Sequence, residues 1–405
     1  MRILIYSINY FPELTGIGKY NAEMAEWLAG HGHEVEVITA PPYYPWWRVQ
    51  SPYRSWAYRT ELINKVKVYR CPIWVPRKPN GIKRLLHLIS FALTSIPLLL
   101  MQIYKRPDVI VVLEPTLFCV PATLVLARLS GTRSWLHVQD FEIDAAFGLG
   151  MFKGKRTIKA AERIECWLMN CFDCVSTISE SMLERLSTKG VAHEKRILLT
   201  NWVDAQDIFP LPAVSICRAE LGIDDDVCVA LYSGNMGEKQ GLEVLLDAAR
   251  ALQHEHGLVF VLCGDGAARE RLMKMGSGLP NVLWLSLQPT DRLNELLNLA
   301  DVHLLPQRAD VADMVMPSKL LGMLASGRPV LATAHLDTQI AKVVLSCGRV
   351  VEPSNTQEFV LGLLELYRSR QVREKLGSAA RQAALAWDKT NVLQNFEFQL
   401  RELCI

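Results

Sequence analysis

A proline, a serine and a lysine precede an apolar run in the stretch DMVMPSKLLGMLASGRPV, residues 313–330. We place Pro317 at the first helical position, which proline favours because its missing N–H needs no partner there. The backbone amides of Ser318, Lys319 and Leu320 would then lack intrahelical acceptors, and Lys319 would add a positive charge. This combination predicts a phosphate-binding helix N-terminus. The alternative is an ordinary core helix whose lysine reaches out to solvent.

Three further turns between an apolar strand pattern and a helical pattern contain glycine. They are GIG with Gly16 and Gly18, SGNMGEKQG with Gly234, Asn235, Lys239 and Gln240, and CGDG with Gly264 and Gly266. Each turn presents backbone N–H groups at a helix start, where the helix dipole favours anions. We therefore expect a diphosphate held between two domains. NAD binding fits less well, because GIGKYN lacks the third glycine of the dinucleotide fingerprint and no acidic residue ends the second strand pattern, EVEVITAPPYY. A P-loop NTPase is also disfavoured, because no G-x-x-x-x-G-K-[ST] motif is present.

A second group of reactive side chains follows the strand pattern SWLHVQD. His137, Asp140 and Glu142 occur there, at the end of a strand, where open α/β sheets bind their ligands. We expect Asp140, ahead of His137 and Glu142, to position the reacting groups. The alternative is that these residues only cap the surface of the domain.

Metal and redox sites are poorly supported by the sequence. Asp224 and Asp226 form a D-x-D in an acidic turn before a strand, which is typical of a solvated turn. The CFDC segment at Cys171 and Cys174 has no second cysteine pair and no strand–helix context. We therefore predict no metal ion and no cofactor.

These candidate residues are positioned by an alternation of strand and helix patterns that begins with RILIYSI and restarts at VCVALYSGNMG. Alternation of this kind is typical of parallel, doubly wound sheets. A chain of 405 residues is long enough for two such domains. We predict a first domain over residues 1–203, a second over 204–385, and a terminal helical segment over 386–405.

Charge is distributed unevenly between the two halves, although the net charge is only +2. Residues 1–200 contain 25 Lys and Arg against 17 Asp and Glu, a net charge of +8, and the remainder has 19 against 25, a net charge of −6. The excess is concentrated in residues 48–106, which hold 12 Lys and Arg, many Trp and Tyr, and one acid, Glu61. This pattern predicts a surface that faces an anionic partner.

The uncharged segment LLHLISFALTSIPLLLMQIY, residues 85–104, has the length of a membrane span. The strand patterns before and after it should belong to one sheet, so it cannot cross a bilayer. We predict either a core helix or a helix lying on a membrane surface, and favour the membrane surface because of its basic, aromatic neighbours. Nucleic acid is the less favoured partner, because no recognised nucleic-acid-binding motif accompanies the basic region.

These motifs together resemble glycosyltransferase family 4, whose members are retaining enzymes of the GT-B fold. The resemblance covers nearly the whole chain, through GHEVEVIT, NWVD, SGNMGEKQGLE, CGDG and PSK…ASGRPV. Within the family, FPELTGIGKY, ITAPPYYP, EPTLF, HVQD and MPSKL are most similar to the colanic-acid exopolysaccharide subgroup. The resemblance implies two facing Rossmann-like domains, with the C-terminal helix returning to the first.

The resemblance also implies the reaction and its partners. The activity would be transfer of a sugar from a nucleotide diphosphate-sugar, with GDP-fucose favoured and UDP-sugars possible, to a polyprenyl-diphosphate-linked oligosaccharide. The enzyme would be cytoplasmic and peripheral at the inner face of the plasma membrane. The glycines of the GIG turn and the polar residues of SGNMGEKQG would contact the diphosphate. The base would lie near Leu285, Leu287 and Gln288.

One departure from the family pattern concerns two carboxylates. The usual E-x₇-E would fall on Met314 and Gly322, and Asp313 is the candidate to replace the first glutamate. This departure keeps two alternatives open, which are a non-catalytic subunit that binds donor or lipid, and a nucleotide-sugar epimerase.

Overall fold

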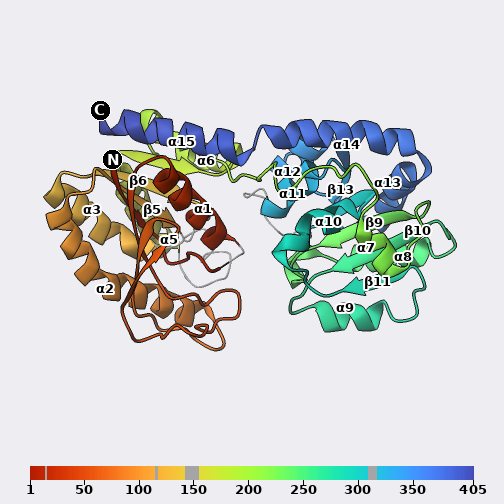
Figure 1. Ribbon diagram of the computed structural model, residues 1–405, viewed down its shortest axis with the longest axis horizontal. Helices are drawn as coiled ribbons and strands as arrows, with labels where there is room; N and C mark the ends of the chain where they lie inside the picture. The colour runs from red at the N-terminus through yellow and green to blue at the C-terminus, as the bar shows by residue number, and fades with distance from the viewer. Residues whose placement is uncertain (14–15, 115–116, 142–154, 309–316) are drawn as a thin grey trace. The chain divides into compact units, whose positions relative to one another are not determined.

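The computed structural model describes residues 1–13, 16–114, 117–141, 155–308 and 317–405 (Figure 1). Residue contacts divide the chain into two compact units. Unit 1 comprises Met1–Thr200 and Leu393–Ile405, and unit 2 comprises Asn201–Val392. Each unit is an α/β body built around its own sheet.

The sheet of unit 1 has the strand order β3-β4-β2-β1-β5-β6-β7-β8 over the described residues. All neighbouring strands are parallel except β3 and β4, which form an antiparallel hairpin. Strands such as RILIY and VIVVLE are apolar almost throughout because helices cover both faces of such a sheet. The strands are β1 Arg2–Tyr6, β2 Glu34–Thr39, β3 Arg59–Ile63, β4 Val66–Arg70, β5 Val109–Glu114, β6 Arg133–Val138, β7 Cys174–Thr177 and β8 Arg196–Leu198.

The helices of unit 1 include one that is unusually long and apolar. α2 packs beside α3 (Figure 1) and connects strands β4 and β5 of one sheet, so it does not cross a bilayer. Among the described residues, α2 is the only helix whose length and composition would suit a membrane span. The helices are α1 Ile17–Gly30, α2 Gly81–Lys105, α3 Val120–Ser130, α5 Lys155–Asn170, α6 Glu180–Thr188 and α15 Lys389–Cys404, with short 3₁₀ turns η1 Leu117–Cys119 and η2 His193–Lys195.

Strands β3 and β4 form a hairpin that the sequence patterns did not predict. Its turn residues Asn64 and Lys65 both have positive φ, 48° and 69°, as a two-residue hairpin turn requires. Arg70 of β4 is buried and forms an ion pair with Glu61 of β3. Its guanidinium also donates to the carbonyls of Ala40 at 3.0 Å and Phe11 at 2.6 Å. The hairpin is therefore fastened to the loops that follow β1 and β2.

Unit 2 contains a parallel sheet with the strand order β11-β10-β9-β12-β13-β14 in the part of the chain that the structure describes. Alternate strand residues face opposite layers, as the pleat requires. Ala230 and Phe260 pack under α8 and α13, whereas Val229 and Val261 pack against α10. The strands are β9 Cys228–Ser233, β10 Leu258–Cys263, β11 Val282–Leu285, β12 Val302–Leu305, β13 Val330–Thr333 and β14 Gly348–Val351.

The helices of unit 2 cover both faces of this sheet. α11 and α12 pack on β12 and β13 through a cluster that includes Leu321 and Ile340. The helices are α7 Ile216–Leu221, α8 Glu243–Ala251, α9 Arg269–Met275, α10 Leu293–Asn298, α11 Ser318–Ala325, α12 Gln339–Val344, α13 Thr356–Arg368 and α14 Arg370–Leu385, with 3₁₀ turns η3 Glu238–Gln240 and η4 Thr290–Arg292.

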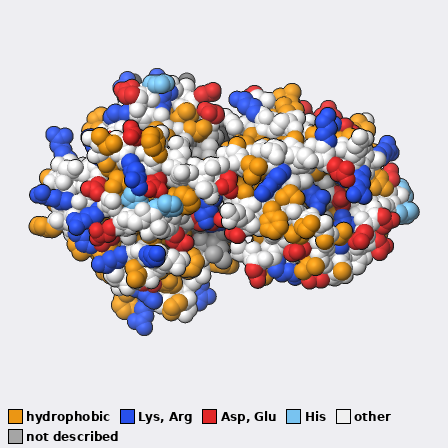
Figure 2. All heavy atoms as spheres, turned by 45° about the horizontal axis from the view of Figure 1, so that its top comes forward, with side chains coloured by type: hydrophobic (Ala, Val, Ile, Leu, Met, Phe, Trp, Pro, Cys, Tyr) orange, Lys and Arg blue, Asp and Glu red, His pale blue; other side chains and the backbone are white. Residues whose placement is uncertain are grey.

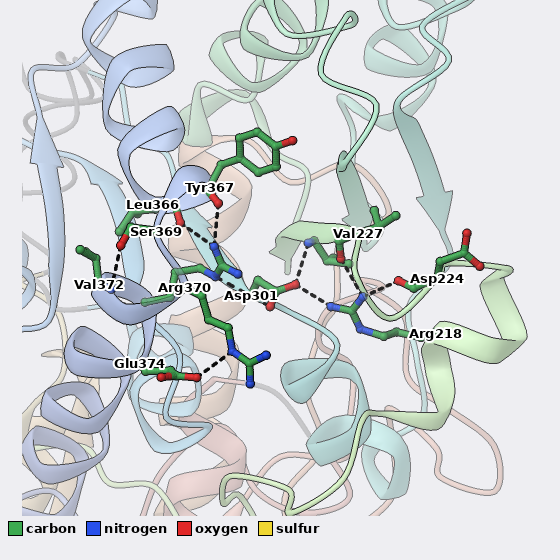
Figure 3. A network of polar contacts seen from close by, with 12 residues as sticks. Arg218, Asp224, Val227, Asp301, Leu366, Tyr367, Ser369, Arg370, Val372 and Glu374 are labelled. Atoms are coloured by element: carbon green, nitrogen blue, oxygen red, sulfur yellow. Dashed lines mark hydrogen bonds and ion pairs between the residues drawn. The ribbon is translucent and has the colours of Figure 1, made fainter.

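A charged cluster ties together the amino ends of β9 and β12 (Figure 3). Asp301 accepts from the Arg218 guanidinium at 2.5 Å and from the amide of Val229 at 2.9 Å. Arg218 also donates to the carbonyl oxygens of Val227 and Asp224, at 2.8 and 3.0 Å. These charged groups provide hydrogen-bond partners for one another. They lie at the amino ends of the strands, whereas the glycine turns lie at the carboxyl ends, so we assign them a structural role.

Candidate functional site

The turns after β9 and β10 pack directly against each other in unit 2. The Gly234 amide donates to the carbonyl of Cys263 at 3.0 Å, and the Met236 amide donates to that of Asp265 at 2.8 Å. A Cβ on Gly264 would lie 1.9 Å from the Gly234 carbonyl oxygen, and one on Gly266 would lie 2.5 Å from that of Met236. Glycine is therefore required at both positions for this close approach. The result is a rigid ledge at the carboxyl ends of the two strands.

Lys319 of α11 lies against this ledge. Its Cδ atom is 3.4 Å from the position that a Cβ on Gly234 would occupy. The ammonium lies 4.4 Å from the centroid of the Tyr232 ring and 3.5 Å from the hydroxyl, which in turn donates to the carbonyl of Asn235 at 2.6 Å. Two of the motifs singled out in the sequence, about 80 residues apart, thus meet in one place.

Burial controls the charge on this lysine. It lowers the pKa of Lys319 from its ordinary value to about 8, because desolvation disfavours the ammonium form. No carboxylate among the described residues lies within ion-pair distance of its Nζ atom. A bound anion would therefore supply the negative charge that the described protein groups do not.

The start of α11 differs in detail from the expectation. Pro317 is the N-cap, with φ −61° and ψ 126°, and Ser318 is the first helical residue. The amide of Leu320 donates to the Pro317 carbonyl at 2.9 Å, so the prediction that this amide lacks an acceptor is wrong. The Ser318 side chain is exposed and is compatible with a ligand.

Three further predicted donor contacts of unit 2 lie on the same ledge or next to it. Asn235 is exposed, and the Oε1 atom of Gln240 is buried without a hydrogen-bond partner among the described residues. Lys239 belongs to η3, and its side chain lies outside the described residues. Leu285 ends β11, and its carbonyl accepts from the Gly264 amide at 3.1 Å.

Beyond β11, the chain continues through the segment predicted to meet the base. Leu287 is exposed, and the side-chain amide of Gln288 donates to the Ser286 carbonyl at 3.0 Å. The Ser286 carbonyl also accepts from the Cys263 thiol at 3.3 Å, which ties this segment to the end of β10. Leu287 and Gln288 stay predicted contacts of a base.

Arg308 is a candidate residue that the sequence analysis missed. It follows β12, and its Cγ atom would lie 2.9 Å from a Cβ on Gly241, whose φ is +62°. It contributes to a cavity of about 470 Å³ beside the starts of α8 and α13, lined by Gly241, Glu243, Val244, Asp247, Gln307, Arg308, Ser354 and Thr356. Its position directly after a strand of a parallel sheet was the available signal.

The candidate catalytic residues of unit 1 are not equally accessible. His137 is buried within β6, and its ring nitrogens lie 2.8 Å from the Ser176 hydroxyl and 3.1 Å from the Gln139 amide nitrogen. Burial lowers the pKa of His137 to about 3, so the imidazole is neutral. It is therefore better suited to orienting Gln139 than to contacting a substrate. Asp140 follows β6 and is exposed.

Two further predicted residues, Glu142 and Asp313, lie outside the described residues. Gly16 and Gly18 are described, and they have different reasons to be glycine. Gly16 is the N-cap of α1 with φ 62°, and no atom lies within 4 Å of the position its Cβ would take. A Cβ on Gly18 would lie 2.9 Å from that of Glu13, so its lack of a side chain serves packing.

No group of three or more His, Cys, Asp and Glu is placed to hold a metal ion within the described ranges.

Residues 15–202 match the family described as Glycosyl transferase 4-like domain, and residues 228–369 match Glycosyl transferases group 1. The chain is 42% identical to WcaI of Escherichia coli (strain K12), a protein assigned as a colanic acid biosynthesis glycosyl transferase, over 99% of this chain and 100% of WcaI. The chain belongs to glycosyltransferase family 4.

Solved structures confirm the GT-B fold of this glycosyltransferase. Sucrose-phosphate synthase from Thermosynechococcus elongatus superposes with a TM-score of 0.77 at 15% identity, covering 100% of this chain and 99% of that one. HepE of Anabaena, solved with UDP and glucose, superposes with a TM-score of 0.69 at 16% identity, covering 99% of this chain and 100% of HepE. WaaG, a glycosyltransferase involved in lipopolysaccharide biosynthesis, superposes with a TM-score of 0.67 at 16% identity, covering 97% of this chain and 98% of WaaG. At these identities the likeness concerns the fold alone.

The structure gives this glycosyltransferase a physical reason for one missing family carboxylate. Gly322 lies in α11, and a Cβ there would lie 3.3 Å from the Cδ1 atom of Leu297. A side chain at position 322 would therefore require the Leu297 side chain to shift by a few tenths of an ångström.

Proposed function

We propose that this glycosyltransferase transfers a sugar, with retention of anomeric configuration, from a nucleotide diphosphate-sugar to a polyprenyl-diphosphate-linked saccharide. GDP-fucose is the favoured donor, and a UDP-sugar is the alternative. The similarity to WcaI supports a role in a pathway for colanic acid or a related exopolysaccharide. The observation that carries the donor site is the contact of Lys319 with the glycine ledge of unit 2.

The chemistry follows from where charge develops. When the bond between the anomeric carbon and the β-phosphate oxygen breaks, negative charge accumulates on the departing diphosphate. Lys319 would stabilise that charge from a partly desolvated position, where an ammonium interacts more strongly than in water. Asn235, Ser318 and the ledge amides would orient the phosphates, and Asp140 remains our candidate to position the reacting groups.

Association with the inner face of the plasma membrane is the second part of the proposal. The solvent-facing side of α2 is apolar, with exposed Ile82, Leu86, Leu93, Leu100 and Tyr104. Figure 2 shows hydrophobic, Lys and Arg, and Asp and Glu side chains mixed over the part of unit 1 that it displays, so the membrane proposal rests on the exposed side of α2. Because an apolar helix face flanked by Lys and Arg binds anionic bilayers, a lipid-linked acceptor would be met at that surface.

The donor site is tested by replacing Lys319 with alanine. We would first identify the nucleotide by thermal stabilisation with GDP and UDP, and then follow transfer of radiolabelled sugar into the lipid fraction of bacterial membranes. Lys319→Ala should reduce transfer by about 100-fold or more, because it removes a donor aimed at the leaving group. The control is Lys342→Ala, which removes an exposed lysine of unit 2 and should leave transfer unchanged.

Equal turnover by the wild-type protein and Lys319→Ala would refute the proposed site. An epimerised nucleotide sugar formed without any lipid product would instead support the epimerase alternative.

A further inference from the structure

Glu13 is a buried carboxylate in the loop between β1 and α1, and only 3% of its surface is exposed. One carboxylate oxygen accepts from the backbone amides of Tyr43 at 2.8 Å and Tyr44 at 2.9 Å. The other accepts from the side-chain amide of Asn9 at 2.8 Å. Burial raises the pKa of Glu13, and the three N–H donors oppose that shift. Glu13 thus fixes the backbone that follows β2 to the loop that follows β1.

The segment held by Glu13 is also clamped from its other end. Trp47 has a φ of 51°, a left-handed conformation that is uncommon for a bulky residue. Its ring is packed 5.8 Å from that of Tyr43 and 5.3 Å from that of His87, with the Arg84 guanidinium 5.5 Å above it. The Arg48 amide donates to the Tyr43 carbonyl at 3.3 Å and closes the loop. Strain that is held this firmly is characteristic of functional sites.

Between these fixed points, two aromatic side chains point outward instead of packing. Tyr44 is 41% exposed and Trp46 is 68% exposed. Both follow β2 at the carboxyl edge of the sheet, where open α/β folds bind ligands. Because their backbone is already ordered, this loop loses little conformational entropy when a ligand stacks on the two rings.

We propose that Tyr44 and Trp46 form a subsite for a sugar ring of the saccharide acceptor, and that Glu13 is the positioning residue of this subsite. This inference rests on the proposed function and names the part of unit 1 that binds the acceptor. One face of a pyranose presents C–H groups that pack on aromatic rings such as those of Tyr44 and Trp46. A fluid lipid surface would not require such a rigid loop, and α2 already offers a larger apolar face.

The subsite is tested by saturation-transfer NMR with the methyl glycosides of glucose, galactose and fucose at millimolar concentration. We expect transfer to at least one of these probes in the wild-type protein and about five- to tenfold less in Trp46→Ala, the loss of one aromatic contact. The matched control is Trp167→Ala, which removes a tryptophan that is 63% exposed on α5 of the same unit. No signal in the wild type, or equal signals in the two variants, would overturn the proposal.

Glu13 is tested separately, with two variants. Glu13→Gln keeps the oxygen that accepts from both tyrosine amides, so it should retain binding of the glycoside. Glu13→Ala removes that oxygen and should weaken glycoside binding to the level of Trp46→Ala, while thermal stabilisation by the nucleotide is retained. Loss of binding in both variants, or in neither, would contradict the positioning role.

These readouts also separate the subsite from the proposed reaction. In the lipid-transfer assay, Trp46→Ala should raise the acceptor concentration needed for half-maximal rate with little change in maximal rate. Glycoside binding without any transfer by the wild type would refute the reaction and leave the subsite standing. Reduced vesicle binding by Trp46→Ala with unchanged glycoside signals would assign the loop to the membrane and refute the subsite.

Discussion

At the scale of single residues, Lys319 predicts how donor binding depends on pH. Its pKa without ligand is lowered to about 8 by burial, and the charged form is the one that holds a diphosphate. Raising the pH through 8 removes that charge, so affinity should fall with rising pH. With this pKa, the charged fraction of Lys319 falls about tenfold between pH 7 and pH 9. We therefore expect the nucleoside diphosphate to bind about tenfold more weakly at pH 9 than at pH 7. Isothermal titration calorimetry at several pH values would measure this decline.

The control for that experiment is Lys319→Arg, because a guanidinium stays protonated throughout this range. Ionisation of the nucleotide itself affects both proteins equally, so the ratio of their affinities isolates the lysine. Parallel pH profiles for the wild type and Lys319→Arg would show that deprotonation of Lys319 does not control binding.

The surroundings of some candidate residues could be anticipated from the sequence and those of others could not, for physical reasons. Lys319 and the glycines at 234 and 264 could be found because each belongs to a recognisable motif. Each also lies where a strand pattern ends or a helical pattern begins. His137 could not be recognised as a core residue, because its burial depends on Ser176 of a strand 39 residues away. The packing of Gly18 against the Glu13 side chain was also not visible in the sequence, and its contact with a ligand stays a prediction.

At the scale of elements, α2 predicts how the protein meets a membrane. Leu93 and Leu100 are one heptad apart on its exposed side, and neither is needed to fill the core. Replacing both with glutamate would place two charges in the apolar face and repel anionic lipids. Sedimentation with phosphatidylglycerol vesicles at low salt should show at least about tenfold weaker binding for Leu93→Glu/Leu100→Glu.

The matched control is Leu361→Glu, an exposed leucine on α13 of unit 2. It should bind vesicles as the wild type does, and the circular dichroism of all three proteins should agree. If the wild type fails to bind even these vesicles, or if the double variant binds equally well, α2 is not the membrane-facing element.

Elements were predictable where a repeating pattern is long and uninterrupted. The 25 residues of α2 and the buried parallel strands of both sheets satisfy that condition. The β3–β4 hairpin does not, because both strands have only five residues, β3 is mostly exposed, and the turn is Asn64-Lys65 without a glycine. Its stability comes from the buried Arg70, whose partners lie up to 59 residues away. Such a long-range contact leaves no local pattern.

At the scale of the whole molecule, the restart of the strand and helix series predicted two α/β bodies, and the GT-B fold is confirmed. The return of the chain to unit 1 after residue 392 was predicted from the family resemblance. The amphipathic pattern of the last helix could not identify its partner, since any apolar groove satisfies it. The partner is specified by side chains on α15, where Glu397 accepts from Trp27 at 3.3 Å and His33 at 3.0 Å.

The buried side of α15 predicts that the last residues of the chain stabilise the first unit. Phe396 is buried edge-on against Trp135 of β6, with ring centroids 5.2 Å apart, whereas Phe398 on the same helix is 56% exposed. Phe396→Ala should cost about 3–5 kcal/mol of unfolding free energy, and Phe398→Ala less than about 0.5 kcal/mol. Hydrogen exchange would locate the loss, since unit 1 and unit 2 need not unfold together.

In that experiment, peptides from β6 and α1 should exchange faster in Phe396→Ala, while peptides from β9 and β10 keep their wild-type rates. Equal exchange in the two phenylalanine variants would show that α15 contributes no such stability. Faster exchange confined to unit 2 would mean that the terminal helix supports the other body. The predicted outcome makes residues 393–405 part of the fold of unit 1, although the whole of unit 2 separates them in the chain from the strands that they cover.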